Sequence, residues 1–451
     1  MRKKKIPILR LNYSKNEKGY ISKGINEILN SGHLTMSKKV FQFEKLFTKY
    51  VGTKYAVAVN SGTSALEISL RALNVEGKSI IVPTNTFMAT PLAVIHAGAK
   101  VIFADISEKT LSIQAGEIEK KITKNTVGII LVHIGGVISN EWSKIKQICI
   151  SKNLFILEDA AHAHGSKINN KYAGNLGIAA AFSFYPTKVL TTGEGGMITT
   201  SDKKLYQKFL ILRDHGKQNP LLNIHNELGS NWRLSEIQGL LGVQQLKKAK
   251  SIVSERIKIA SIYDKILKNT SNMRLLEIPS HIKSSYYKYI IFVNKNIRDK
   301  VKKMMSEKFG ISLPGEVYNH LCHSQPVFKK HKSKIIKKGD YSFKSAKKGL
   351  QKDLAEIEDA GLWKTERVLA SDQNNHITLE DGSQVINMCA NNYLGLANNP
   401  EVIQAAKDSF SDWGFGLSSV RFICGTQSIH KTLENKVTEF LGMEDTILYA
   451  A

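Results

Sequence analysis

The feature of this sequence that most constrains its fold is a series of short apolar segments between residues 55 and 200. Seven segments are typical of β-strands: 55–59, 79–83, 100–104, 127–133, 154–158, 179–184 and 196–200. Helix-length segments such as 64–73 and 142–152 separate most of the early ones. Near-continuous apolar strands that alternate with helices predict an α/β fold, in which a mostly parallel sheet is covered by helices on both faces. Ligands of such folds bind beyond the carboxyl ends of the strands.

Helices predominate outside this region. Residues 38–51 place their apolar side chains on one helical stripe, which Gly52 closes as a C-cap. Long helices are predicted at 235–261 and 262–267. A smaller mixed segment comes next, with a strand at 286–293 and a helix at 300–309.

Charge divides the chain into two parts. The 451 residues carry 64 lysines and arginines against 39 acidic residues, a net charge of +25. Residues 347–451 contain only 9 of the basic residues but 15 of the acidic ones, so the positive excess belongs to the preceding part. Together with the length, this predicts more than one domain and a separate segment at 347–451. The change from alternating strands to long helices and a smaller mixed segment divides the preceding part into a large domain with an N-terminal arm at 1–235 and a small domain at 236–346.

A basic chain attracts polyanions such as nucleic acid, an anionic membrane or a phosphorylated substrate. Only residues 329–348 are dense in lysine, and they lack the fold signature and interleaved aromatic residues of a nucleic-acid module. We therefore expect solvated helix faces, and neither nucleic acid nor membrane as a partner. No segment is typical of a signal peptide or a membrane span. Four separated cysteines without CxxC spacing indicate a cytoplasmic protein and no zinc site: Cys149, Cys322, Cys389 and Cys424.

Three segments carry residue types that suggest chemistry. Residues 57–67 run from a strand through a glycine turn into a helix, where backbone N–H groups and the hydroxyls of Thr63 and Ser64 could bind a phosphate. The same pattern also occurs as ordinary helix capping. Asp159 ends a buried strand, where an ionised carboxylate needs a positive partner such as a protonated heterocyclic nitrogen. A metal cluster of Asp159, His162 and His164 is the less favoured alternative.

The third segment contains a single lysine. Lys188 lies in an apolar loop between two strands, where partial desolvation should lower its pKa and favour the nucleophilic amine that forms a Schiff base. A solvated lysine without a role is the common alternative. Pyridoxal 5'-phosphate requires three groups: an anchor for its phosphate, a carboxylate for its pyridine nitrogen and an amine for its aldehyde. The three segments supply all of them, so the combination predicts this cofactor.

These segments resemble the DegT/DnrJ/StrS family of pyridoxal-phosphate-dependent sugar aminotransferases, which have the aspartate-aminotransferase fold (fold type I). The resemblance covers residues 1 to about 346. The matching runs, in the order of the family, are SGTSA (61–65), PTNTF (83–87), EDAAHAHG (158–165), FSFYPTK (182–188), GEGG (193–196), RDHG (213–216) and NWRLSEIQ (231–238).

The resemblance implies a role for individual residues. Lys188 would form the Schiff base with the cofactor and move the proton between substrate and cofactor. Asp159 would pair with the pyridine nitrogen, His162 would hydrogen-bond the phenolic oxygen and Phe87 would stack on the ring. Because a related dehydratase branch carries histidine in place of this lysine, Lys188 favours transamination.

The remaining implied residues hold the phosphate or the substrate. The phosphate residues are Ser61, Gly62, Thr63, Ser64 and Ser183, with Asn231 contributed by a neighbouring subunit. That arrangement implies a homodimer with shared active sites. Glu194, Tyr318 and His320 are expected near the substrate. The reaction implied is the transfer of an amino group, usually from glutamate, to a keto sugar carried on a nucleoside diphosphate.

The second part of the chain resembles a different pyridoxal-phosphate enzyme, 2-amino-3-ketobutyrate coenzyme A ligase, also called glycine C-acetyltransferase. The matching segments are 385–397, 414–427 and 440–445. The resemblance ends before that family's cofactor-stacking histidine, aspartate and lysine, so Asn392, Tyr393 and Arg421 would keep only the shape of a substrate entry. The first part also ends before the strand and helix that complete the small domain of its family. Glycine C-acetyltransferase activity and a non-catalytic chain from a rearranged reading frame are therefore the alternatives to a sugar aminotransferase.

Overall fold

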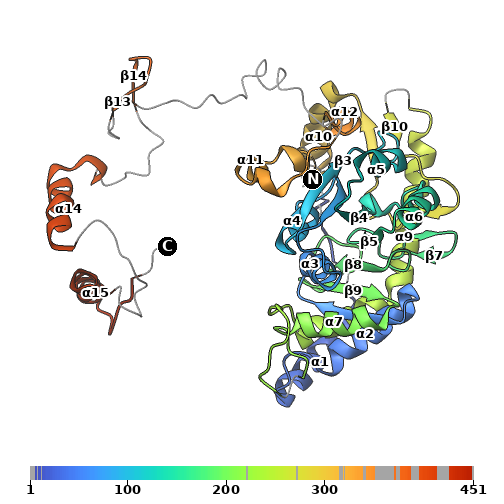
Figure 1. The fold of residues 1–451 in the computed structure, drawn as a ribbon, viewed down its shortest axis with the longest axis horizontal. Helices are drawn as coiled ribbons and strands as arrows, with labels where there is room; N and C mark the ends of the chain where they lie inside the picture. Colours follow the sequence, from blue (N-terminus) through green and yellow to red (C-terminus); the bar gives the residue numbers. More distant parts are fainter. Residues whose placement is uncertain are drawn as a thin grey trace. The chain divides into compact units, whose positions relative to one another are not determined.

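The computed structural model describes residues 6–7, 9–11, 13–219, 222–270, 273–313, 318, 320–338, 342–350, 370–371, 376–386, 396–413 and 426–448. The chain forms two compact units, Met1–Asp353 and Leu354–Ala451. Figure 1 shows the helices and strands that make up each unit.

A seven-stranded sheet forms the centre of the first unit. Its strands, in spatial order, are β1 (Tyr55–Val59), β9 (Gly196–Thr200), β8 (Ala179–Ser183), β5 (Phe155–Asp159), β4 (Thr126–Val132), β2 (Ser79–Pro83) and β3 (Lys100–Ala104). Only β9 runs against its neighbours; the other strands are parallel to one another. The predicted α/β fold with a mostly parallel sheet is confirmed, and each strand end lies within one residue of its expected position.

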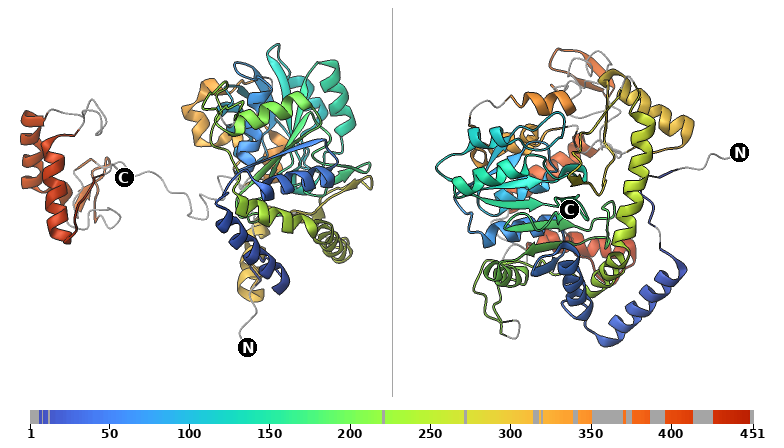
Figure 2. Two further views of the ribbon diagram at one scale, coloured as in Figure 1. Left: turned by 90° about the horizontal axis from the view of Figure 1, so that it is seen from below. Right: turned by 90° about the vertical axis from the view of Figure 1, so that its right-hand side faces the viewer.

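Helices cover both faces of this sheet (Figure 1 and Figure 2). One face packs against α2 (Lys38–Val51), α5 (Ala115–Lys121), α6 (Trp142–Ser151) and α8 (Glu236–Lys247), and the other against α3 (Gly62–Ala72), α4 (Ala89–His96) and α7 (Lys203–Arg213). Strand β1 shows the reason. Its alternate residues Ala56 and Ala58 join the first core, whereas Val57 and Val59 join the second, as the period of two in a strand requires. Burial on both faces explains why the strands are apolar throughout.

Two predicted elements are wrong in extent. The helix expected at 235–261 is interrupted at Lys248, which caps α8 and precedes α9 (Ala249–Leu267). The strand expected at 286–293 is reduced to β12 (Ile291–Val293), because Tyr286 has a φ of 48° and turns the chain out of the extended conformation. Residues 284–288 consequently form a loop that packs beside the end of β4.

The remaining elements of the first unit lie around this core. They are α1 (Lys15–Ser31), β6 (Lys167–Ile168), β7 (Lys171–Tyr172), β10 (Met273–Leu275), β11 (Ile282–Lys283), α10 (Lys295–Phe309), α11 (Pro326–Lys330) and α12 (Lys344–Leu350). Helix α10 begins about one turn before the expected start at residue 300.

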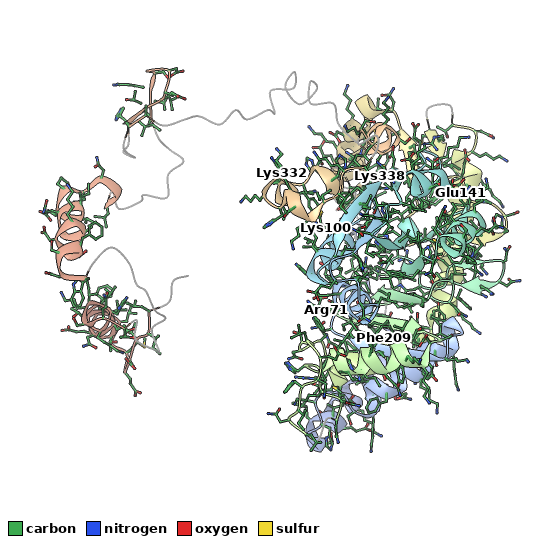
Figure 3. All side chains as sticks on the ribbon, in the orientation of Figure 1. Arg71, Lys100, Glu141, Phe209, Lys332 and Lys338 are labelled. Atoms are coloured by element: carbon green, nitrogen blue, oxygen red, sulfur yellow. The ribbon has the colours of Figure 1, made fainter. Side chains whose placement is uncertain are left out.

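The end of the first unit is docked on the sheet. Lys121 donates from Nζ to the carbonyl of Lys338 at 2.6 Å, and Lys338, which is labelled in Figure 3, donates in turn to the carbonyl of Ile122. Phe343 is buried in the core, and the Asp105 carboxylate accepts the first backbone N–H groups of α12. Lysines in this basic stretch therefore serve the fold.

The second unit contains β13 (His376–Thr378) paired with β14 (Gln384–Ile386), and then α14 (Pro400–Trp413) and α15 (Ser428–Leu441). None of the described residues of α14 is buried. Asn392, Tyr393 and Arg421, expected from the resemblance of this part, lie outside the described residues. Across the described parts of the chain, no helix combines the length and the apolar character needed to cross a membrane.

Candidate active site

The predicted site residues gather at one edge of the central sheet. Strands β1, β8, β5, β4 and β2 are parallel, so their carboxyl ends open at the same edge. Each of these strands ends at a residue or segment of the site. They are the turn into α3 after β1, Ser183 at the end of β8, Asp159 at the end of β5, His133 after β4 and the loop after β2. This is the edge at which the sequence predicted ligand binding.

The turn between β1 and α3 is closely fitted to the end of β8. Ser61 caps α3 by accepting a hydrogen bond from the backbone N–H of Ser64 at 3.0 Å. A Cβ on Gly62 would lie 2.7 Å from the Cβ of Ser183, and a Cβ on Gly196 would lie 2.1 Å from the carbonyl oxygen of Ser61. Glycine is therefore required for the helix N-terminus to lie this close to the strand end.

The hydroxyl groups in this turn differ in availability. Ser64 is 7% exposed, and its Oγ donates to Oδ1 of Asn60 at 2.6 Å while also contacting Oγ of Ser61 at 2.8 Å. Ser61 and Ser64 are thus engaged within the turn. Thr63 and Ser183 are half-buried beside this turn. Hydroxyl groups next to a helix N-terminus suit a phosphate group.

Asp159 is held rigidly at the end of β5. It is 7% exposed, and its Oδ2 accepts a hydrogen bond from Oγ1 of Thr90 at 2.8 Å. Thr90 is hydrogen-bonded at 2.8 Å to Thr86, and the backbone N–H of Ala161 donates to Oδ1 at 3.2 Å. No cation pairs with this carboxylate within the described residues. A buried carboxylate of this kind suits a protonated ring nitrogen.

His162 is a neutral imidazole of defined tautomer. Burial, together with the smaller effects of the charges on Lys188 and Lys288, holds its pKa well below the usual 6.5. Its Nδ1 accepts the backbone N–H of Gly135 at 3.3 Å, so the proton of the neutral ring lies on Nε2. The ring stacks on Tyr287 with centroids 4.2 Å apart. His162 therefore presents one N–H donor.

His164 is placed differently. It is fully buried between Phe182 and Phe184, and burial lowers its pKa to about 3. In the described part of the chain, no group of three or more histidine, cysteine, aspartate or glutamate side chains is arranged to hold a metal ion. The aromatic packing agrees with a structural role for His164.

Lys188 lies in the loop between β8 and β9, as the sequence predicted. Its pKa is lowered to about 8, mainly by burial; the charge on Asp159 opposes this effect and the charge on Lys288 adds to it. Its Nζ lies 4.9 Å from the ring centroid of Tyr287, whose hydroxyl is hydrogen-bonded to Thr187 at 3.1 Å. A substantial fraction of the amine is thus neutral near pH 7 to 8, as a nucleophile requires.

A buried hydrogen-bond network lies behind this edge of the sheet. Glu158 is completely buried and contacts Nε2 of His133 at 2.9 Å. Its carboxylate also accepts backbone N–H groups of Gly174, Leu176 and Gly177 at 2.7–2.8 Å. Since Glu158 precedes Asp159 on β5, this network fixes the strand end that carries Asp159.

The segment after α10 also reaches the site. The backbone N–H of Cys322 donates to the carbonyl of Thr84 at 3.0 Å, and Oγ1 of Thr84 lies 2.6 Å from Nδ1 of His323. Burial raises the pKa of Tyr318, and the nearby Tyr287 and Asp159 raise it further. His320 is exposed. Tyr318 thus lies beside the predicted site.

Three other predicted residues lie at the rim. Phe87 is 57% exposed in the loop after β2. Glu194 is exposed, and its backbone carbonyl accepts hydrogen bonds from the side chains of Thr192 and Gln238. Asn231 is exposed, and its carbonyl accepts a hydrogen bond from Nδ2 of Asn60 at 3.3 Å, beside the turn into α3.

Sequence reasoning missed Thr90, Tyr287 and the residue next to it, Lys288. Tyr287 was placed in a strand, although the polar run Ser-Ser-Tyr-Tyr-Lys at 284–288 lacks the apolar character of the other strands. Thr90 lies four residues after Thr86, so the two fall on the same side of one turn. That spacing next to a strand end was the available signal.

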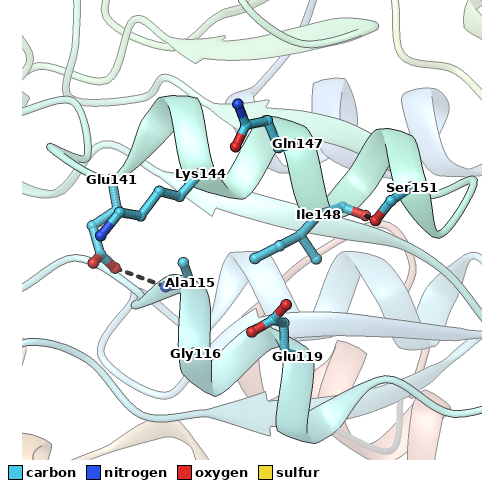
Figure 4. Close-up of a pocket in the computed structure, with 8 residues that line it drawn as sticks. All are labelled: Ala115, Gly116, Glu119, Glu141, Lys144, Gln147, Ile148 and Ser151. Carbon is cyan, nitrogen blue, oxygen red and sulfur yellow. Dashed lines mark hydrogen bonds between the residues drawn. The ribbon is translucent and has the colours of Figure 1, made fainter.

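A separate hollow lies between α5 and α6 (Figure 4). Glu141 spans its rim and accepts the backbone N–H of Ala115 at 2.7 Å, which caps α5. The hollow contains none of the predicted site residues, and we assign it no chemical role.

Comparison with known proteins agrees with this geometry. The family model described as the DegT/DnrJ/EryC1/StrS aminotransferase family matches residues 15–350. The chain belongs to this aminotransferase family. It is therefore an enzyme of the transaminase class, and its cofactor is pyridoxal 5'-phosphate. A second model, aminotransferase class I and II, matches residues 383–451.

Individual relatives of the family are similar over most of their length. GDP-perosamine synthase of Escherichia coli O157:H7 is 33% identical over 331 residues, which are 72% of this chain and 87% of the relative. UDP-4-amino-4,6-dideoxy-N-acetyl-beta-L-altrosamine transaminase of Campylobacter jejuni is 36% identical, over 60% of this chain and 72% of the relative. The structure of DesV from S. venezuelae has a TM-score of 0.70 at 28% identity, covering 76% of this chain and 90% of that one.

The residues of the site fit the family's cofactor. The glycines let the helix N-terminus lie against the end of β8, the buried Asp159 forms no ion pair among the described residues, and Lys188 is an amine of lowered pKa. These are the anchor, ring partner and nucleophile that pyridoxal phosphate needs.

Proposed function

We propose that this aminotransferase transfers an amino group from an amino acid, with glutamate as the expected donor, to a keto sugar carried on a nucleoside diphosphate. The observation that carries the proposal is the desolvated Lys188 beside Asp159 and a neutral His162. The names of similar proteins, among them GDP-perosamine synthase and a UDP-linked altrosamine transaminase, support the sugar substrate.

In this proposal each residue has one task. Pyridoxal phosphate, when bound, supplies the electron sink for transamination. Lys188 holds the cofactor covalently and moves a proton at Nζ, for which a pKa of about 8 is suitable. Asp159 keeps the ring nitrogen protonated, and Nε2 of His162 donates to the phenolic oxygen. Phe87 covers the ring face.

The phosphate is assigned to the turn into α3. Gly62 and Thr63 supply the helix N-terminus, Ser183 supplies a hydroxyl, and Ser61 and Ser64 hold the turn in shape. We assign Asn231 to the phosphate of the partner site, which requires a homodimer; its exposed side chain supports this assignment. Glu194, Tyr318 and His320 are assigned to the substrate side.

An absorbance experiment tests the cofactor assignment. The purified full chain is mixed with pyridoxal phosphate, reduced with borohydride and digested for peptide mapping. We expect a yellow absorbance band that reduction abolishes, with the added mass on Lys188. Label spread over surface lysines would contradict the assignment. Adding glutamate before reduction should instead abolish the covalent label, and a nucleoside-diphosphate keto sugar should restore it.

For the second part of the chain we propose a fragment of the glycine C-acetyltransferase type. The residues that support it are in segments 385–397, 414–427 and 440–445, within the region that matches aminotransferase class I and II. The matching segments include neither the cofactor lysine nor the pyridine-binding aspartate of that type, whereas the first unit contains Lys188 and Asp159, so glycine C-acetyltransferase activity is the weaker alternative. A chain without catalysis is the other alternative, and the glutamate reaction separates it from the proposal.

We also propose a cytoplasmic location. The support is the cysteine pattern, since Cys149 and Cys322 are both buried and unpaired with each other.

A further inference from the structure

Two cations beside the site have no carboxylate partner among the described residues. Lys288 comes directly after Tyr287, and Arg256 reaches the same loop from α9, donating from Nη1 to the carbonyl of Tyr286 at 2.9 Å. Within the part of the chain that the structure describes, neither side chain forms an ion pair. Both are half-buried, and burial lowers the pKa of each. Two such partly desolvated cations side by side are costly unless an anion binds there.

The position of Lys288 relative to the reacting amine is well defined. Its Nζ lies 5.1 Å from the ring centroid of Tyr287, and Nζ of Lys188 lies 4.9 Å from the same centroid. His162 stacks on this ring at 4.2 Å. Both amines and the neutral imidazole therefore lie around the same tyrosine ring, close enough for the charge on Lys288 to lower the pKa of Lys188.

The loop that carries Lys288 is firmly held. The backbone N–H of Lys288 donates to the carbonyl of Gly135 at 3.2 Å, and Gly135 is the residue whose N–H fixes His162. A Cβ on Gly136 would lie 2.9 Å from Oγ of Ser285 and 3.2 Å from the backbone nitrogen of Tyr287. The loop therefore cannot withdraw without disturbing the site.

On this basis we propose that Lys288 and Arg256 bind a carboxylate of the amino donor. An amino acid carries a carboxylate on the very carbon whose nitrogen is transferred, so a negative charge must lie within a few bonds of the amine that reacts at Lys188. The reacting carbon of a keto sugar is flanked by neutral carbons, and its phosphates are attached to a different carbon of the ring. Lys288 beside the Tyr287 ring and Arg256 at the carbonyl of Tyr286 match the carboxylate of the donor. This inference rests on the proposed function.

The test measures binding and each half of the reaction separately. In the cofactor-loaded full chain, Lys288→Gln should weaken the binding of glutarate, an unreactive dicarboxylate, by about tenfold or more in calorimetry, as expected for loss of a charged hydrogen bond. Lys283→Gln removes an equal charge from an exposed position on strand β11, five residues earlier, and should change affinity less than about twofold. Lys288→Arg should retain affinity within about threefold, which would show that charge rather than packing is responsible.

Kinetics distinguish the carboxylate from a diphosphate. We expect Lys288→Gln to raise the glutamate concentration needed for half-maximal conversion in the first half-reaction about tenfold, and to leave UDP and GDP affinity unchanged. Loss of nucleoside-diphosphate affinity with unchanged glutarate binding would overturn the inference. So would equal effects of Lys288→Gln and Lys283→Gln. If the unmodified enzyme converts glutamate but Lys288→Gln binds glutarate normally, the inference fails and the proposed function stands. If the unmodified enzyme converts no amino acid, the proposed function itself fails.

Discussion

At the scale of single residues, the site depends on how burial tunes the ionisation of Lys188 and His162 beside a fixed carboxylate. Lys188, His162 and Asp159 lie within one small region, yet burial makes the amine partly neutral and the imidazole wholly neutral, while Asp159 is held by Thr90 and a backbone N–H. The difference arises because burial disfavours the charged form of lysine and histidine unless a partner offsets it.

The lowered pKa of Lys188 predicts how cofactor capture depends on pH. Because the pKa is about 8, the neutral amine increases about tenfold from pH 6 to pH 7 and levels off above pH 8. We expect the rate at which the cofactor-free protein develops its absorbance band to track this curve in stopped-flow mixing. Lys188→Ala is the control and should give no such band. A rate that is flat from pH 6 to 8 would contradict the prediction.

The lowered pKa of Lys188 also makes the free energy of unfolding depend on pH. The folded-state pKa of Lys188 lies below its ordinary value of 10.5, so the unfolded chain binds more protons between about pH 8 and 10.5. This group therefore makes the cofactor-free protein more stable as the pH rises through that window. Urea unfolding of the parent and of Lys188→Met should show a smaller rise for the variant.

Thr90 offers a test of how Asp159 is held. Thr90→Val keeps the shape but removes the 2.8 Å hydrogen bond to Oδ2, which is worth about 1.5–3 kcal/mol for a charged acceptor. We expect a loss of about tenfold to a hundredfold in kcat/KM for glutamate and weaker cofactor binding by fluorescence titration. Thr86→Val, one hydrogen bond further from the carboxylate, is the matched control and should lose less. Equal losses would mean that the threonines act by packing alone.

At the scale of elements, the site is formed by strand ends and helix starts that approach closely. The α3 N-terminus touches the end of β8 because Gly62 has no Cβ, and the loop 284–288 touches the β4 end through Gly135 and Gly136. The sequence predicted the glycine turn into α3 but not its contact with β8. It placed residues 286–288 in a strand with the apolar residues that follow them, and so did not predict the second contact.

Gly62→Ala tests the α3 contact. The new Cβ would lie 2.7 Å from that of Ser183, so the helix start must move away from the strand. We expect a loss of about 1–3 kcal/mol in the free energy of unfolding and a clear loss of pyridoxal-phosphate affinity. Gly116→Ala, in the first turn of α5 with nothing within 4 Å of the added Cβ, should be neutral or stabilising by a few tenths of a kcal/mol. Unchanged cofactor affinity in Gly62→Ala would show that the turn does not hold the phosphate.

At the scale of the whole molecule, the two units can be separated. The boundary between units falls at 353/354, after α12, whereas the change in composition suggested 346/347. The division of the first unit at 235/236 stays a prediction. All cofactor residues that we assign lie in the first unit, so the second should not be needed for cofactor binding.

Truncation tests this separation. A chain ending at Asp353 should keep the absorbance band with pyridoxal phosphate and a Tm within a few degrees of the full chain. A chain ending at Lys338 lacks Phe343 and Ala346, both buried, and should lose about 3–5 kcal/mol of stability. Differential scanning calorimetry distinguishes the two. Loss of the band in the longer truncation would mean that the second unit contributes to the site.

The amino-acid sequence was sufficient to predict the α/β fold and the seven strands, because strand burial is a local property read from a few adjacent residues. It also placed Lys188, Asp159 and His162 at or after strand ends, while their roles at the cofactor stay a prediction. The residues that surround those three became visible only in the folded chain. Thr90 meets Asp159 across 69 positions, and Tyr287 and Lys288 meet His162 and Lys188 across about a hundred or more. Contacts between segments so far apart depend on how helices and loops pack on the sheet, and no local pattern specifies that packing.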